Sequence, residues 1–244
     1  MQDAEQPFTA TSLRWEPTRR VLYVCGGDHG LFRLSEGPQG WALTAVDTEP
    51  KTAPGRSGSL WCFDVDVSPD LVVAVFAGRD RSTLRAYAQD EILSPSWNPV
   101  APAVKREVAL GKKVFSPGAI AYAVEMRGRH AYVGLGDGGI ARVHLVSGAV
   151  EPGPRGVGPR SKVRDLALAG HHLYAAAERS AGGGLLEIDL NEHWDPDMPV
   201  LAHGGQEIAD CEGDRRPTPY FCRVDARLLP GTTDVIRSEE HTSE

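Results

Sequence analysis

Apolar and polar residues alternate with a period of two along most of the chain, as they do in half-buried β-strands. Four apolar pairs, each separated by one polar or small residue, recur in the sequence: Leu13 and Trp15, Val65 and Val67, Val124 and Met126, and Leu166 and Leu168. No long segment keeps the spacing of an amphipathic helix. The triplets 28–30, 137–139 and 182–184 supply residues that tolerate positive φ in tight turns. The pattern therefore predicts a series of antiparallel hairpins.

The same order of three strands and two turns occurs four times, in residues 11–35, 62–89, 122–146 and 163–190. Aligning these repeats places four residues in one column: Tyr23, Val73, Tyr132 and Tyr174. A fourth, more variable strand is predicted after each repeat, at 41–46, 105–110, 149–151 and 200–202. Four strands in a unit of about 40 to 60 residues are typical of a β-propeller blade.

A fifth repeat begins at Tyr220 and breaks off after Ile236, inside a strand, where an unfinished sheet would present unpaired backbone groups. The last eight residues, Arg237–Glu244 (RSEEHTSE), resemble the translation of a sequencing-library adapter; a natural acidic tail is the alternative. We therefore predict an all-β fold: a partial β-propeller of four four-stranded antiparallel blades plus an incomplete fifth. A single domain is expected at 1–236, an artefactual tail at 237–244, and a natural protein that continues beyond Ile236.

The third and fourth repeats carry a resemblance to a known family. Their sequences, GRHAYVGLGDGGIARVHLVSG and GHHLYAAAERSAGGGLLEIDLNEHWDPDMPVLAHG, resemble the bacterial LVIVD/YVTN-like propeller repeat. The first and second repeats depart from it: Val73 replaces the tyrosine, and Ser82-Thr83 replaces the Gly pair. The Trp-Asp ending of WD40 repeats is absent. The resemblance implies a propeller, a shape that scaffolds, ligand binders, hydrolases and oxidoreductases share, so it leaves the activity open.

Charge and hydropathy exclude two classes of partner. The formal charge is −7, from 26 basic and 33 acidic residues without a long run of either sign, which argues against binding to a phosphate backbone. No apolar run approaches the roughly 20 residues of a membrane helix, and no export signal opens the chain. The compartment stays open: secreted or periplasmic if an upstream export signal was lost, and otherwise cytoplasmic.

Charged residues near the predicted first strands are the candidate site. Asp64, Arg164, Asp165 and Arg223 would face the ring axis or the blade junctions if the first strand lines the channel. Facing the axis, they would form a polar pocket for a small ligand or cation. The alternative is that they form ion pairs or capped turns between blades, because charges at such junctions need partners.

Two further patterns are interpreted as structural. Gly134, Gly136 and Gly139 form a GxGxxG string, but a strand follows it instead of a helix, so we predict a hairpin and no cofactor. No histidine has zinc-site spacing, and strand alternation would place His171 and His172 on opposite faces, so no metal site is expected.

The cysteines and one tryptophan leave alternatives open. Cys211 and Cys222 flank a polar loop and would form a disulfide in an oxidising compartment, or remain thiols in a cytosol. Cys25 and Cys62 lie in apolar strands and are expected to be buried. Trp97 lies in the longest irregular stretch, either as a contact point for a partner or as a cover for a blade edge.

The sequence contains no Gly-x-Ser-x-Gly, phosphate-loop or His-Glu-x-x-His motif. The expected function is therefore a binding or scaffold module that recognises a protein partner or small ligand. The alternative is a propeller-type hydrolase, lactonase or oxidoreductase. An enzyme would bring at least three of five residues within about 8 Å in one open pocket: His29, Asp64, His130, Arg164 and Asp165. Open sheet edges would also let the chain associate with itself.

Overall fold

The structure is a computed structural model, and it describes most of the chain. The described residues are 9–37, 40–48, 60–78, 81–100, 102–110, 119–157, 161–179, 184–203, 225–228 and 235–238. Backbone contacts divide the chain into unit 1, Met1–Leu110, and unit 2, Gly111–Glu244. Each unit is described by itself.

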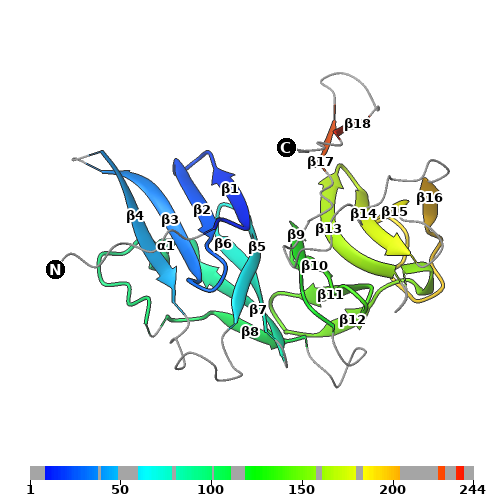
Figure 1. Cartoon of the computed structure of the whole chain (residues 1–244), viewed down its shortest axis with the longest axis horizontal. Helices are drawn as coiled ribbons and strands as arrows, with labels where there is room; N and C mark the ends of the chain where they lie inside the picture. The colour runs from blue at the N-terminus through cyan, green and yellow to red at the C-terminus, as the bar shows by residue number, and fades with distance from the viewer. Residues whose placement is uncertain are drawn as a thin grey trace, which may run out of the picture. The chain divides into compact units, whose positions relative to one another are not determined.

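Unit 1 contains two four-stranded antiparallel sheets, here called blade 1 and blade 2 (Figure 1). The strands of blade 1 pair in chain order: β1 (Ser12–Glu16), β2 (Val21–Cys25), β3 (Leu31–Gly37) and β4 (Gly40–Asp47). Those of blade 2 do the same: β5 (Trp61–Val67), β6 (Leu71–Ala77), β7 (Ser82–Ala88) and β8 (Arg106–Ala109). A single-turn helix, α1 (Gln89–Ile92), follows β7.

Unit 2 repeats the arrangement in blades 3 and 4. Blade 3 consists of β9 (Ala123–Arg127), β10 (His130–Gly134), β11 (Ile140–His144) and β12 (Val150–Pro152). A short 3-10 turn, η1 (Arg155–Val157), leads to blade 4, made of β13 (Ser161–Ala169), β14 (His172–Arg179), β15 (Gly184–Asp189) and β16 (Leu201–His203). A two-stranded sheet follows, β17 (Asp225–Leu228) with β18 (Val235–Ser238), whose second strand includes the first two residues of the tail.

The predicted fold class is confirmed: the part of the chain that the structure describes is nearly all-β, with four four-stranded antiparallel blades and the two strands of a fifth sheet. Two of the predicted turns also occur: Gly30 and Gly139 adopt φ of 95° and 76°, which favours glycine. Residues 182 and 183 of the third predicted turn lie outside the described residues. The GxGxxG string is the β10–β11 hairpin, as expected. Within the described residues, no helix is long or apolar enough to cross a membrane.

The core of each unit lies between its two blades. In unit 1 the buried side chains of Tyr23 and Leu31 from blade 1 belong to one cluster with Val65 and Phe76 from blade 2. In unit 2 the corresponding cluster joins Tyr132 and Ile140 to Leu173 and Leu186. Removing these apolar faces from water, at roughly 25 cal/mol per Å², is what holds two neighbouring blades together. One blade therefore needs another sheet to cover each of its apolar faces.

Candidate functional site

The two units join their blades by the same backbone device. The turn between the second and third strands of the first blade reaches the first strand of the next, and pairs Gly27 with Cys62 in unit 1 and Gly136 with Val163 in unit 2. The Cys62 amide donates to the Gly27 carbonyl at 2.8 Å, and the Val163 amide donates to the Gly136 carbonyl at 3.2 Å. In each unit the bridge lies just before a predicted site residue, Asp64 after Cys62 and Asp165 after Val163.

Asp64 and Asp165 occupy the same place at these junctions. Each follows a register shift in the first strand of its blade, between Cys62 and Asp64 in β5 and between Val163 and Asp165 in β13. Each carboxylate accepts a hydrogen bond from the backbone amide of the next residue, at 2.9 Å for Asp64 and 3.0 Å for Asp165. Asp64 also accepts a hydrogen bond from the Ser12 hydroxyl of blade 1. Both side chains thus stabilise an irregular strand beside a blade junction.

Arg164 also lies at a junction, with its guanidinium 4.6 Å from the centre of the Tyr122 ring, just before β9. Asp64 and Arg164 thus contact neighbouring residues at blade junctions, and their predicted role in ligand binding stays a prediction. Arg223, Cys211 and Cys222 lie outside the described residues, so their predicted roles stay predictions.

The residues proposed for an enzyme site do not converge within unit 2. His130 begins β10, whereas Arg164 and Asp165 lie near the other end of that strand, beside the Gly136–Val163 bridge. The length of β10 separates the two positions by about 13 Å at roughly 3.3 Å per residue. In unit 1, His29 lies in the β2–β3 turn, with its Nδ1 atom 2.8 Å from its neighbour Asp28.

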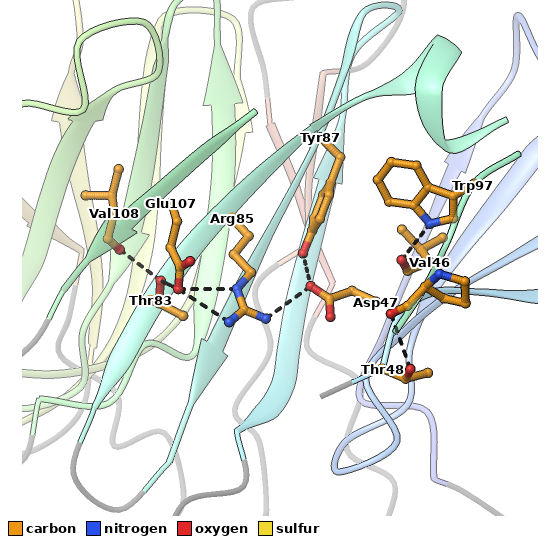
Figure 2. A network of polar contacts seen from close by, with 10 residues as sticks. Val46, Asp47, Thr48, Thr83, Arg85, Tyr87, Trp97, Glu107 and Val108 are labelled. Atoms are coloured by element: carbon orange, nitrogen blue, oxygen red, sulfur yellow. Dashed lines mark hydrogen bonds and ion pairs between the residues drawn. The ribbon is translucent and has the colours of Figure 1, made fainter. Parts of the chain in front are cut away.

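A buried polar network joins blade 1 to blade 2 (Figure 2), and no sequence motif indicated it. Asp47 ends β4, and its Oδ2 atom accepts hydrogen bonds from the Tyr87 hydroxyl and, at 3.1 Å, from the Arg85 guanidinium. Arg85 also binds Glu107 at 3.3 Å and lies over the Phe76 ring. The Asp47 side chain is only 2% exposed, so its charge depends on these partners.

Burial raises the pKa of the two phenols at this junction. It raises the pKa of Tyr87 well above the ordinary 10.0, and the nearby Asp47 carboxylate raises the pKa further. Burial also raises the pKa of Tyr23, to about 12. Both hydroxyls are therefore neutral donors near pH 7, Tyr87 to Asp47 and Tyr23 to Gln89 at 3.3 Å. The network connects the two blades, because Asp47 of blade 1 accepts hydrogen bonds from Arg85 and Tyr87 of blade 2.

A disulfide that the sequence did not predict lies at the same junction. Cys25 of β2 and Cys62 of β5 are fully buried, as expected, and are bonded to one another. Their Cα atoms are 5.2 Å apart, within the usual range for disulfides. The repeat alignment could have indicated the pair, because both cysteines stand at the positions that approach one another in each unit.

Trp97 covers a blade edge, and an equivalent residue does so in unit 2. The Trp97 indole donates to the Val46 carbonyl of β4 at 2.8 Å, and the Trp194 indole donates to the Pro152 carbonyl of β12 at 3.0 Å. Both tryptophans follow the third strand of one blade and reach the fourth strand of the blade before it. Trp97 is partly buried against the core, so its role is structural.

Strand alternation does not separate His171 from His172, and that sequence argument is wrong. The β13–β14 turn contains His171, and β14 begins only at His172, so the two residues do not alternate within one strand. Their ring centroids lie 4.0 Å apart. Asp189, the last residue of β15, is paired with His172 in the ladder.

The outer side of blade 1 carries four exposed large apolar side chains, Leu13, Trp15, Trp41 and Leu43, around residues that are partly exposed or, at Val24, buried. Leu13 and Trp15 of β1 face away from blade 2, because Ser12 and Arg14 on the alternate positions bind Asp64 and Asp66 of β5. The ladder continues the Trp15 row across the sheet through Leu22, Leu34 and Leu43. We call this surface the apolar face; its members are Leu13, Trp15, Leu22, Val24, Phe32, Leu34, Trp41 and Leu43.

The blades and their junctions define a chain of β-propeller type. No protein-family model matches it, and no curated protein matches it significantly. Among solved structures, the designed protein Ika8 is similar at a TM-score of 0.53 and 13% identity, over 90% of this chain and 53% of that one. U3-55K is similar at 0.51 and 12%, over 81% of this chain and 52% of that one.

A "putative 6-phosphogluconolactonase" from Bacteroides uniformis is similar at a TM-score of 0.48 and 16% identity, over 84% of this chain and 59% of that one. The chain spans about half the length of Ika8 and U3-55K, at 53% and 52%. Likeness at such identities concerns the fold alone.

Proposed function

We propose that the protein is a binding module of β-propeller type, and that it recognises a protein partner through the apolar face of blade 1. The observation that carries the proposal is the exposure of large apolar side chains on one side of one sheet. Trp15 and Trp41 are 45% and 52% exposed, and Leu13 and Leu43 are 50% and 48% exposed. Tryptophan is the residue most enriched among those that dominate binding energy at protein interfaces.

The two tryptophans form one surface although they come from the outer strands of the sheet. Trp15 lies on β1 and Trp41 on β4, yet their ring centroids are 6.4 Å apart. The rings therefore lean toward one another over the central strands β2 and β3. A contiguous apolar patch of this kind is a common feature of protein interaction sites.

The occupant best suited to the apolar face is another apolar β-sheet face. Blade 1 already binds such a surface on its opposite side, where Tyr23 and Leu31 pack with Val65 and Phe76 of blade 2. We commit to a second copy of the chain as the occupant. The ladder places Glu36 opposite Trp41 on this face, but the Glu36 carboxylate is paired with Arg20 at 2.9 Å. Two copies of the face therefore meet without a net like charge, and a patch that matches itself forms a closed two-fold dimer.

The family resemblance does not decide between a binding and an enzymatic role, because scaffolds, ligand binders and enzymes share the propeller shape. The contacts of the described residues do not favour the alternative of a hydrolase, lactonase or oxidoreductase. Asp64 and Arg164, two of its candidate residues, are engaged at blade junctions.

The test measures self-association of the full chain by sedimentation velocity over a range of concentrations. We expect a reversible dimer for the natural sequence. Replacing both tryptophans, Trp15→Ser with Trp41→Ser, should weaken dimerisation at least tenfold, because both side chains lose their buried contact area. Fluorescence at the remaining tryptophans and far-ultraviolet circular dichroism would verify that the variant is folded.

The matched control is Val146→Ser, which removes an exposed apolar side chain from unit 2; Val146 is 59% exposed. This variant should dimerise like the natural chain. A monomer at all concentrations, or a dimer that the double tryptophan substitution leaves unchanged, would contradict the proposal.

A further inference from the structure

A cluster of metal-binding side chains lies at one end of blade 4. His171 is in the β13–β14 turn, His172 begins β14, and Asp189 ends β15. Gly170, with φ of 62°, makes the turn that places His171 beside His172. In the antiparallel ladder His172 is directly opposite Asp189, so these two side chains emerge on the same face of the sheet.

The donor atoms of the three residues are close enough to share one ion. One imidazole nitrogen from each histidine and one carboxylate oxygen all lie within 4.8 Å of one another. Zinc binds such nitrogens and oxygens at about 2.0 to 2.2 Å, so two donors on one ion lie roughly 3 to 4 Å apart. Side-chain movements of about 1 Å would therefore complete the site. We propose that His171, His172 and Asp189 bind a divalent transition-metal ion of the zinc class.

A second carboxylate, that of Glu187, lies beside His172 of the candidate site. Glu187 precedes Asp189 by two residues in β15 and emerges on the same face. Its Oε1 atom lies 2.8 Å from Nδ1 of His172. The two atoms are not aligned as a hydrogen bond, and a rotation of the imidazole would be needed for Nδ1–H to donate to Glu187. That arrangement leaves the lone pair of Nε2 for a metal ion, as is usual behind histidine ligands. The Asp189 side chain is also fixed in place, because its Oδ1 atom accepts a hydrogen bond from the Asn191 backbone amide at 2.9 Å.

The donor set selects among ions. Two imidazoles and one carboxylate suit zinc and its transition-metal neighbours, whereas calcium and magnesium prefer oxygen ligands alone. Three protein donors also leave room for a water molecule or a ligand on the ion. The inference is independent of the proposed function, because the cluster lies in unit 2 and the apolar face in unit 1.

Blade 3 offers a matched control at the equivalent ladder position. His130 is opposite His144, and the ring centroids of this pair are 5.1 Å apart. Among the residues that the structure describes, this pair belongs to no group of three metal-binding side chains. The pair thus has the histidines without the third donor.

The experiment titrates the metal-free full chain with Zn²⁺ in competition with a chromogenic chelator, at pH 7.5. His172→Ala and Asp189→Asn should each lower the zinc affinity at least tenfold, and Glu187→Gln should lower it about tenfold, because outer partners typically contribute 10- to 100-fold. His144→Ala should bind zinc like the natural chain, and Ca²⁺ should not compete.

Substitution with Co²⁺ gives a second measurement that does not depend on affinity alone. The visible absorption of bound cobalt should appear with the natural chain and with His144→Ala, and should be lost in His172→Ala. Absence of zinc binding to the natural chain would overturn the inference. Equal binding by His172→Ala and Asp189→Asn, or an equal loss in His144→Ala, would overturn it as well.

Discussion

Units 1 and 2 build the same blade junction from different chemistry. In both, a glycine turn bridges to the first strand of the next blade, that strand shifts register before an aspartate, and a tryptophan reaches back to a fourth strand. The places of Cys25 and Cys62 in unit 1 are taken by Gly134 and Val163 in unit 2.

The difference shows that different side chains can occupy the same junction positions without a change of backbone geometry. A Cβ atom added at Gly134 would lie 2.9 Å from Cγ1 of Val163, so the valine already fills the space that a second side chain would need. Unit 1 uses a covalent bond in that space. It also adds the buried contact of Asp47 with Arg85, whereas unit 2 places Arg142 over the ring of Trp194, 5.3 Å from its centre.

The largest effect is expected from breaking the buried ion pair of unit 1. Arg85→Ala leaves the Asp47 carboxylate buried without its cation, which should lower the free energy of unfolding by about 3 to 5 kcal/mol. Hydrogen exchange of peptides from β6 and β14, read by mass spectrometry, would measure the loss in each unit. The loss should appear in unit 1.

The matched control for Arg85 is Arg155→Ala in unit 2. Arg155 pairs with Asp197 at 3.0 Å, but their side chains are 78% and 76% exposed. Exposed pairs contribute about 0 to 1 kcal/mol, so this variant should be nearly as stable as the natural chain. Equal losses from both substitutions would show that the burial of Asp47 does not matter.

Removing the disulfide should have the next largest effect. The bond closes a loop with a sequence separation of 37 residues, and the chain-entropy model gives about 4 kcal/mol for such a loop. Cys25→Ala with Cys62→Ala should therefore speed exchange in unit 1 and leave unit 2 unchanged. A reductant should destabilise the natural chain and have no such effect on the variant. Indifference of both proteins to the reductant would contradict the bond.

The smallest effect is expected at the tryptophans, where the units should behave alike. Trp97→Phe and Trp194→Phe keep an aromatic ring but remove the N–H donor, so each leaves a strand carbonyl without its bond. Each substitution should cost about 1 to 2 kcal/mol in its own unit, measured by the same exchange experiment. A cost in only one unit would mean that the two contacts are not equivalent.

The sequence predicted the blades because strands have a local signature. Alternation and turn glycines are visible over a few residues, and the variable fourth strands were found close to their predicted positions, with 41–46 observed as Gly40–Asp47. The contacts between blades have no such signature. Nothing near Asp47 in the sequence indicates Arg85, because ladder and blade packing bring the two together.

Two errors have a similar origin. Cys25 was expected to be buried, which is correct, but its partner is set by the Gly27 bridge rather than by spacing along the chain. His171 was assigned to a strand, and a shift of the strand start by one residue changed which side chains share a face. An error of one residue in the start of a strand is thus enough to make a sequence-based argument about a metal site wrong.

Transplanting the disulfide tests most directly whether the two junctions share one backbone geometry. Gly134→Cys and Val163→Cys would be introduced together into the Cys25→Ala, Cys62→Ala background, followed by non-reducing peptide mapping by mass spectrometry. The account predicts a disulfide between positions 134 and 163. Free thiols at both positions in the folded, air-oxidised protein would contradict it.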